Sequence, residues 1–151
     1  MPKVTVVDTS CLILLNKIGQ LNLLQKLFKE VTITQTVANE FNKPIPKWIN
    51  IIEVNPKKTR GLASFLDLGE ASSIVVASSK ENSLLIIDEN KGRKVAKEME
   101  IQLTGSLGVL VTAKRKGYIK AVKPIIDQIQ QTNFRISTNL IELVLEKVNE
   151  S

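Results

Sequence analysis

Two hydrophobic runs in this chain each end in an aspartate. Residues 4–7 (Val-Thr-Val-Val) lead into Asp8, and residues 84–87 (Leu-Leu-Ile-Ile) lead into Asp88. Short aliphatic and β-branched runs followed by helix-patterned stretches are typical of parallel strands in an α/β sheet. Such sheets hold their chemistry in a crevice beyond the carboxyl ends of the strands. We therefore expect both carboxylates in one crevice, and because no cationic residue flanks either one in sequence, a divalent metal ion would balance their charge.

Further acids have positions from which they could converge on the same crevice. Glu40 lies late in the helix expected after the second strand, Glu70 opens the helix before residues 84–87, and Glu89 is a candidate fifth acid. Magnesium and manganese prefer oxygen ligands, and magnesium keeps several waters, so a few carboxylates and a substrate phosphate would complete the coordination shell. Without the metal, these like charges would repel, and the pKa of at least one carboxyl would rise.

Each acid taken alone also has a structural interpretation. Asp8 and Asp88 precede predicted helices and could act as N-caps, while Glu70 in a first helical turn would gain from the helix dipole. For any single residue that interpretation is favoured. It accounts neither for two acids at strand ends nor for Glu40, so the joint pattern favours a site.

The composition excludes several kinds of catalysis. The 151 residues contain no histidine, which removes Ser-His-Asp and Cys-His nucleophiles and histidine-bound zinc. Twenty-one Lys and Arg against 15 Asp and Glu give a net charge of +6. A basic protein that gathers carboxylates at one place suits a polyanionic substrate held around a metal.

The composition also predicts a soluble cytoplasmic protein. The single cysteine, Cys11, excludes an internal disulfide and fits a reducing cytosol. It lies in an apolar helical stretch and is expected to be a small core residue rather than a nucleophile. The apolar runs are far shorter than the roughly 20 residues of a membrane span. Residues 1–3 lead directly into a strand and leave no room for a signal peptide.

Strands and helices alternate along the chain, which predicts one α/β domain over residues 1–151 with right-handed crossovers. The expected strands are 4–7, 31–34, 50–54, 84–87 and a short one near 102–103. The expected helices are 10–18, 21–28, 35–41, 69–81, about 90–99, one that starts within 104–108 and ends at Gly117, 121–131 and 138–148.

Five short motifs in this order resemble the PIN-domain family. They are Val-Val-Asp-Thr-Ser at 6–10, a glutamate in the helix after strand two, Gly-Glu-Ala-Ser-Ser-Ile at 69–74, Ile-Asp-Glu at 87–89 and Thr-Gly-Ser-Leu-Gly at 104–108. The chain is most similar to small prokaryotic relatives of VapC-type toxins, and the similarity spans nearly its whole length.

The resemblance implies a three-layer α/β/α sandwich with a mainly parallel sheet and a magnesium- or manganese-dependent ribonuclease site. The four family acids map onto Asp8, Glu40, Glu70 and Asp88, although VapC-type members commonly have Asp at the third position. Asp8, Glu70 and Asp88 would be the metal ligands, with Glu70 binding directly or through water. Glu40 would hold a water or orient the nucleophile. The small hydroxyl residue two places after the first acid maps onto Ser10, which would hydrogen-bond a carboxylate or a phosphate oxygen.

Other residues are candidates for substrate binding. Lys91 and Arg93 follow Asp88 and could meet RNA phosphates, although a basic cluster is often only a solvated face. Thr104 and Ser106 flank a turn before a helix whose backbone N–H groups could hold a phosphate; an ordinary capped turn is the equal alternative. No Walker A or GxGxxG pattern supports nucleotide-cofactor binding.

Two alternative functions follow from the same residues. A phosphoacceptor receiver domain or a DxD phosphatase needs a second acid beside Asp8, where Thr9 and Ser10 stand. A non-catalytic PIN-like module that binds nucleic acid or protein is the stronger alternative.

Partners follow from the resemblance and from the C-terminal region. A helical extension over about 121–149 goes beyond the compact toxin pattern. An antitoxin protein and a second copy of the chain are the candidate partners. The apolar stripe Leu140, Leu143, Val144 and Val148 is a candidate dimer surface, and closure of the domain's own core is the alternative.

Overall fold

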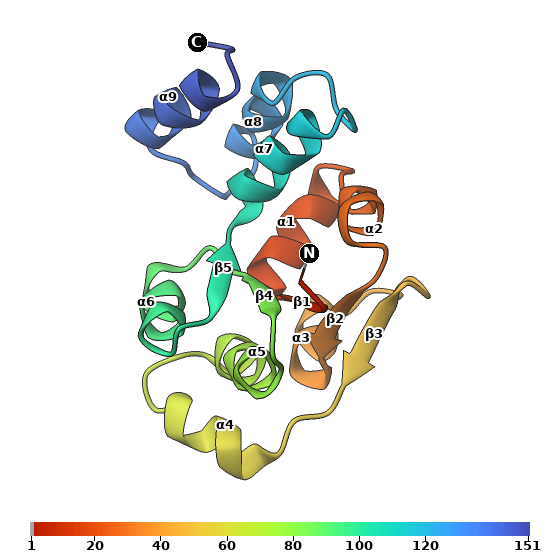
Figure 1. Ribbon diagram of the computed structural model, residues 1–151, viewed down its shortest axis with the longest axis vertical. Helices are drawn as coiled ribbons and strands as arrows, with labels where there is room; N and C mark the ends of the chain where they lie inside the picture. Colours follow the sequence, from red (N-terminus) through yellow and green to blue (C-terminus); the bar gives the residue numbers. More distant parts are fainter. Residues whose placement is uncertain (1) are drawn as a thin grey trace.

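The computed structural model describes residues 2–151 and has one parallel sheet between two layers of helices (Figure 1). The strand order is β3-β2-β1-β4-β5, and every neighbouring pair is parallel. The strands are β1 (Val4–Val7), β2 (Val31–Thr34), β3 (Ile49–Ile52), β4 (Ser83–Ile86) and β5 (Gln102–Thr104). The three-layer α/β/α sandwich expected from the sequence is therefore confirmed.

The helices connect these strands as crossovers, and three more follow the last strand. They are α1 (Thr9–Lys17), α2 (Asn22–Phe28), α3 (Gln35–Phe41), α4 (Pro56–Leu62), α5 (Leu68–Ser79), α6 (Asn90–Glu98), α7 (Ser106–Arg115), α8 (Lys123–Gln130) and α9 (Thr138–Lys147). Among the helices of residues 2–151, none combines the length and apolarity that a membrane span requires.

The sheet separates two hydrophobic cores, and successive side chains of the central strands point alternately into one core and the other. Val6 and Leu85 point into one core, where they pack with residues of α5 and α6 such as Ile74. Val7 and Ile86, the next residues on the same strands, point into the other core with α1, α2, α3 and α7. Because both faces are covered, the strands are almost continuously apolar, which is the pattern of a buried parallel sheet.

The order in which strands are added to the sheet changes side between β1 and β4, while all the strands stay parallel. From β1 the chain adds β2 and β3 on one side, and it then returns to add β4 and β5 on the other. Helices that follow β1 and β4 therefore leave on opposite faces and open a crevice at the carboxyl ends of these two strands. The first residue after β1 is Asp8, whose N–H donates to the Ile86 carbonyl at 3.0 Å.

One helix was not expected from the sequence. β3 ends at Ile52, two residues before the predicted end at Val54, and the Asn-Pro-Lys-Lys segment at 55–58, expected only to break the strand, begins α4. Asn55 caps this helix by accepting a hydrogen bond from the Lys57 N–H at 2.9 Å, and Pro56 occupies the first turn. In the sequence, Pro56 indicates only the end of a strand. The fixed φ of proline also suits the first turn of a helix when a capping residue precedes it.

The C-terminal helices share the core of the α1 face. Val122, Ile126, Ile129 and Val148 are buried in the same cluster as Leu12 of α1. The apolar stripe predicted on the last helix contributes only two of its four residues to this core.

Val144 and Val148 are buried, whereas Leu140 is 44% exposed and Leu143 is 63% exposed. Half of the stripe therefore closes the protein's own core, and half faces outward.

Glu150 ties the end of the chain to α7 and α8. Its carboxylate accepts a hydrogen bond from Lys114 Nζ at 2.7 Å and from the N–H groups of Val122 and Lys123 at 2.8 and 2.9 Å. Burial opposes the charged form, but the hydrogen bonds from Lys114 and these N–H groups outweigh it and lower the pKa of Glu150 to about 2. The charged carboxylate thus replaces a missing cap at the start of α8.

We expect Glu150→Ala to lower the free energy of unfolding by about 1–3 kcal/mol at neutral pH, because it removes charge-assisted hydrogen bonds. A carboxyl with a depressed pKa stabilises the fold above its unfolded pKa, so the difference from wild type should shrink as the pH falls from about 4.5 toward about 2. Urea unfolding at several pH values measures this. Equal stability of the two proteins at pH 7 would show that Glu150 does not secure the C-terminal helices.

Candidate active site

A cavity of about 540 Å³ opens at the crevice beside the end of β1. It gathers carboxylates that are far apart in the sequence and includes several of the residues expected at the site. Its lining comprises Asp8, Thr9, Ser10, Ile13, Glu40, Phe65, Leu66, Asp67, Glu70, Glu89 and Lys91. We call this the acidic cavity.

Asp8 is the most deeply placed acid of the cavity. It is 3% exposed and stands at the N-cap position of α1 with an extended backbone. Within residues 2–151, no side-chain cap hydrogen bond joins Asp8 to α1, and its Oδ1 atom is buried without a hydrogen-bond partner. Simple capping therefore does not account for this carboxylate.

Glu70 contributes a second buried carboxylate from the first turn of α5. It is 5% exposed, and across the described part of the chain its Oε2 atom has no hydrogen-bond partner. The side chain reaches α6, where a Cβ added to Gly92 would lie 3.0 Å from Oε2 and would collide with Ile87. Glycine at position 92 thus makes room for the Glu70 carboxylate.

Glu40 lies at the exposed edge of the cavity and is held by α1. Its Oε1 atom accepts a hydrogen bond from Thr9 Oγ1 at 2.5 Å. A Cβ added to Gly69 would collide with both of these groups. The Gly-Glu pair at 69–70 therefore serves two acids, because the glycine admits Glu40 and the next residue supplies Glu70.

Asp67 is an acid of the cavity that the sequence analysis did not identify. It caps α5 by accepting a hydrogen bond from the Glu70 N–H at 2.8 Å. Helix α5 begins at Leu68, one residue earlier than expected, which places Asp67 at the N-cap. The available signal was Asp67 three residues before Glu70, the spacing of a capping box.

Burial and mutual repulsion perturb the two deepest acids. The pKa of Asp8 is raised to about 7, chiefly by burial; a hydrogen bond from the Thr9 N–H opposes the rise, and the charges of Glu70, Asp67 and Glu40 add to it. Burial also raises the pKa of Glu70 to about 7, assisted by the charges of Asp67 and Glu89. The rise expected for crowded carboxylates without a cation is therefore present at both positions.

Asp88 points elsewhere. It lines a neighbouring cavity of about 590 Å³ with Arg93, Thr104 and residues of α7 and α9. Its Oδ1 accepts a hydrogen bond from the Ser106 N–H at 2.8 Å, and its Oδ2 accepts from Ser106 Oγ at 2.6 Å and from the Cys11 thiol at 3.1 Å. The next residue, Glu89, lines the acidic cavity, so the two cavities adjoin at this loop.

These contacts alter the expectations for the surrounding residues. The Ser106 N–H at the start of α7, for which a phosphate site and an ordinary capped turn were equal alternatives, is engaged by the Asp88 carboxylate. Arg93 donates to the Ile87 carbonyl at 2.8 Å and holds the loop after β4. Cys11 is buried, and burial followed by the charge of Asp88 raises its thiol pKa well above the ordinary value. Cys11 is a core residue, as expected, and its thiol donates a hydrogen bond to Asp88.

The donor set suits a hard divalent cation in part. Two buried carboxylate oxygens without partners, Asp8 Oδ1 and Glu70 Oε2, are the oxygen donors that magnesium and manganese prefer. Over residues 2–151, however, no three acidic, cysteine or histidine side chains form a group arranged to hold a metal. The three expected ligands Asp8, Glu70 and Asp88 do not form such a group, because Ser106 and Cys11 hold the Asp88 carboxylate.

The buried acids should make the metal-free protein less stable as the pH rises. A carboxyl whose folded pKa exceeds its unfolded pKa binds more protons in the native state, so stability falls between about pH 4 and about pH 7. We expect Asp8→Asn, which removes one of these charges, to raise the free energy of unfolding at pH 8 by about 1–4 kcal/mol.

Urea unfolding in EDTA at pH 5 and pH 8 measures this effect, with Glu53→Gln, an exposed acid outside the cavity, as the control. A metal-free wild type that gains stability from pH 5 to pH 8 would contradict the burial of these charges.

Comparison with known proteins identifies the family. No curated protein and no solved structure matches the chain. A family model, DUF3368, described as a PIN domain, matches residues 4–150. The match covers both cavities, all five strands and the C-terminal helices, and on this ground the chain belongs to the PIN-domain family.

Proposed function

We propose that this protein is a metal-dependent endoribonuclease that hydrolyses RNA phosphodiester bonds. PIN domains are generally nucleases. One observation on this chain itself also supports a metal-dependent activity. Two buried carboxylates at the end of β1 and the start of α5 share one cavity, and each has an oxygen without a partner among the described residues. Such an arrangement destabilises the fold unless a cation or protons neutralise it.

The acids of the site would have two roles, metal binding and orientation of the attacking water. Asp8 and Glu70 would hold Mg²⁺ or Mn²⁺, joined by Asp88 as the third proposed ligand. A bound divalent cation supplies a water of lowered pKa and neutralises negative charge on the phosphate. Glu40, fixed by Thr9, would orient the attacking water from the exposed edge of the cavity.

Residues on the rim would bind the substrate. Lys91 lines the cavity and would attract a phosphate toward an otherwise acidic site. Ser10 and Glu89 also line it, and Ser10 would donate a hydrogen bond to a carboxylate or a phosphate oxygen. Arg93, Thr104 and Ser106 would act indirectly, since they surround Asp88 in the neighbouring cavity.

The biological setting is a further part of the proposal. We infer a cytoplasmic toxin of a toxin–antitoxin pair, with an antitoxin protein and a second copy of the chain as partners. The resemblance to VapC-type proteins supports the toxin role. The outward-facing Leu140 and Leu143 of α9 support a protein-binding surface at that end of the molecule.

A non-catalytic PIN-like binding module is the second candidate. The observation that favours it is the absence, within residues 2–151, of an assembled three-ligand group. The binding module would take nucleic acid or protein as its partner, and only the nuclease would require the acids of the cavity for turnover.

We expect Asp8→Asn to reduce manganese-dependent RNA cleavage by at least about 100-fold, because it removes the deepest carboxylate ligand while preserving shape. Folding and RNA binding should persist, as circular dichroism and fluorescence anisotropy can establish. Excess EDTA should abolish wild-type cleavage in a gel assay. Cleavage that survives both the substitution and EDTA would come from a contaminant and would leave the binding module as the better account.

Metal binding should be visible without any activity. At a concentration 100 times the dissociation constant, a ligand stabilises the native state by about 2.7 kcal/mol, so millimolar manganese should raise the melting temperature. Asp8→Asn and Glu70→Gln should remove most of this rise. Asp88→Asn should blunt it less, because that carboxylate is already satisfied by Ser106 and Cys11.

Differential scanning fluorimetry measures these shifts at pH 8, again with Glu53→Gln as the control. A melting temperature that does not respond to manganese or magnesium would argue against a metal site. A loss of response in Asp88→Asn as large as in Asp8→Asn would show that Asp88 binds the metal as strongly as the two buried acids.

A further inference from the structure

An exposed phenylalanine stands at the rim of the acidic cavity. Phe65 is 56% exposed and lies in the turn between α4 and α5. Backbone hydrogen bonds from the N–H groups of Phe65 and Leu66 to the Leu62 carbonyl hold this turn, at 3.3 and 3.1 Å. Leu66 is buried and anchors the turn in the core. The ring is therefore presented to solvent on a fixed support.

Phe65 belongs to two cavities at once. It lines the acidic cavity and also a second hollow of about 330 Å³, whose other lining residues are Lys91, Lys94, Val95 and Glu98 of α6. Lys91 is the other residue that both linings contain. A single exposed apolar side chain needs no explanation, but an aromatic ring and a cation that together separate an acidic cavity from a second hollow form a built feature.

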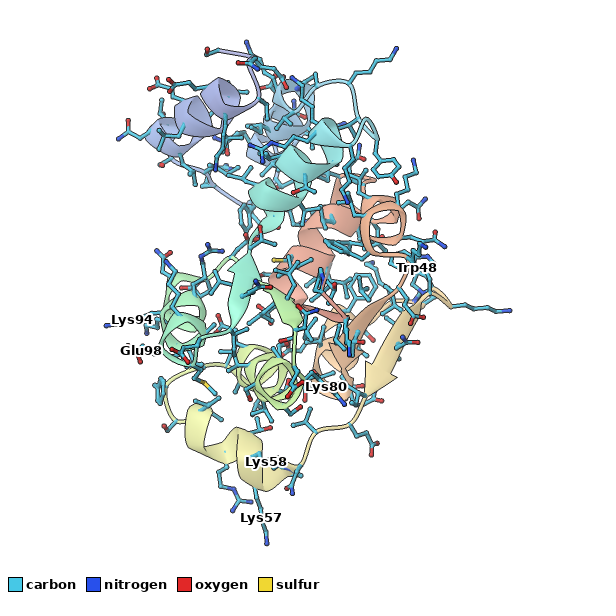
Figure 2. The ribbon with its side chains drawn as sticks, viewed as in Figure 1. Trp48, Lys57, Lys58, Lys80, Lys94 and Glu98 are labelled. Carbon is cyan, nitrogen blue, oxygen red and sulfur yellow. The ribbon has the colours of Figure 1, made fainter. Side chains whose placement is uncertain are left out.

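The second hollow continues along one face of α6. Lys91, Lys94, Val95 and Glu98 recur at intervals of three and four residues, so they share a helical face. Figure 2 shows Lys94 and Glu98 projecting outward from α6. The buried Gly92 and Ala96 lie on the opposite face and pack the helix against the protein. Two cations one turn apart thus lead away from the acidic cavity past the ring.

We propose that Phe65 is a stacking platform for an unpaired nucleobase of single-stranded RNA, with the next phosphate held by Lys91 and Lys94. This inference rests on the proposed function for its substrate class and names the strand's route out of the acidic cavity. An aromatic face binds any base by stacking and requires that the base be unpaired. The acids of the cavity repel phosphate groups, so cations beside the ring would secure the strand where the acids cannot.

Phe65→Ala should weaken the binding of a short single-stranded RNA about tenfold, the usual scale for the loss of one base–aromatic stack. Phe65→Trp should restore or exceed wild-type affinity. Leu68→Ala is the matched control, since Leu68 is also 56% exposed and lies three residues along the chain, but lines a different cavity. Fluorescence anisotropy on the Asp8→Asn background measures affinity without cleavage.

A series of otherwise identical RNAs with one abasic position tests the stack itself. At one position the abasic RNA should bind the Phe65 protein about tenfold more weakly, and Phe65→Ala should bind it no worse than intact RNA. Quenching of the new indole in Phe65→Trp by intact RNA, beyond that of the Trp48 background, gives an independent signature.

The outcomes separate this inference from the proposed function. Unchanged RNA affinity in Phe65→Ala would overturn the platform even if wild type cleaves RNA, and so would the absence of measurable RNA binding. A loss that is equal for intact RNA and for every abasic RNA would also overturn it, because the ring would then act only on the protein. A stacking effect without cleavage by wild type would retain the platform and favour the non-catalytic module.

Discussion

The burial of two carboxylates at the reversal point of the sheet is the constraint on which the rest of the structure depends. Asp8 leaves the end of β1 and Glu70 enters from α5, and both are almost removed from solvent. A buried charge without a partner is strongly unfavourable, which is why the pKa values of both acids rise. Protons neutralise these acids below about pH 7, and in the proposed metal site a cation would do so at higher pH. Strongly perturbed carboxyls in a cavity are the physical basis on which this cavity is proposed as the active site.

The surroundings of these acids are built to hold them in place. Thr9 fixes Glu40, Asp67 caps the helix that carries Glu70, and Gly92 leaves the space that the Glu70 side chain needs. Asp88 differs from these acids, because the N–H and hydroxyl of Ser106 and the thiol of Cys11 donate hydrogen bonds to its carboxylate. Asp88 therefore links β4, α1 and α7 at the boundary of two cavities. In the proposed metal site, a cation would have to compete with these hydrogen bonds for the Asp88 carboxylate.

The distribution of charge would give a direction to the proposed RNA substrate. The acidic cavity repels a phosphate in the absence of a cation, whereas Lys91 on its rim and Lys94 one turn further along α6 attract one. Phe65 stands between the two regions. The basic net charge of the chain is thus less informative than the local order of acid, ring and cation.

The sequence alone determined the strands, most of the helices and four of the five acids that line the acidic cavity, because hydrophobic periodicity and turn residues are local signals. Asp8 at a strand end and the Gly-Glu pair at 69–70 were readable for the same reason. Helix α4 was missed because a proline after a strand looks the same whether it ends one element or opens the next.

Only the tertiary structure decided that Asp67 joins the acidic cavity, that Asp88 turns toward Ser106, and that Phe65 and Lys91 line the same two cavities. These outcomes depend on how helices from distant parts of the chain pack at the ends of β1 and β4. Side-chain direction there is set by space and hydrogen-bond partners in three dimensions, which sequence spacing does not record.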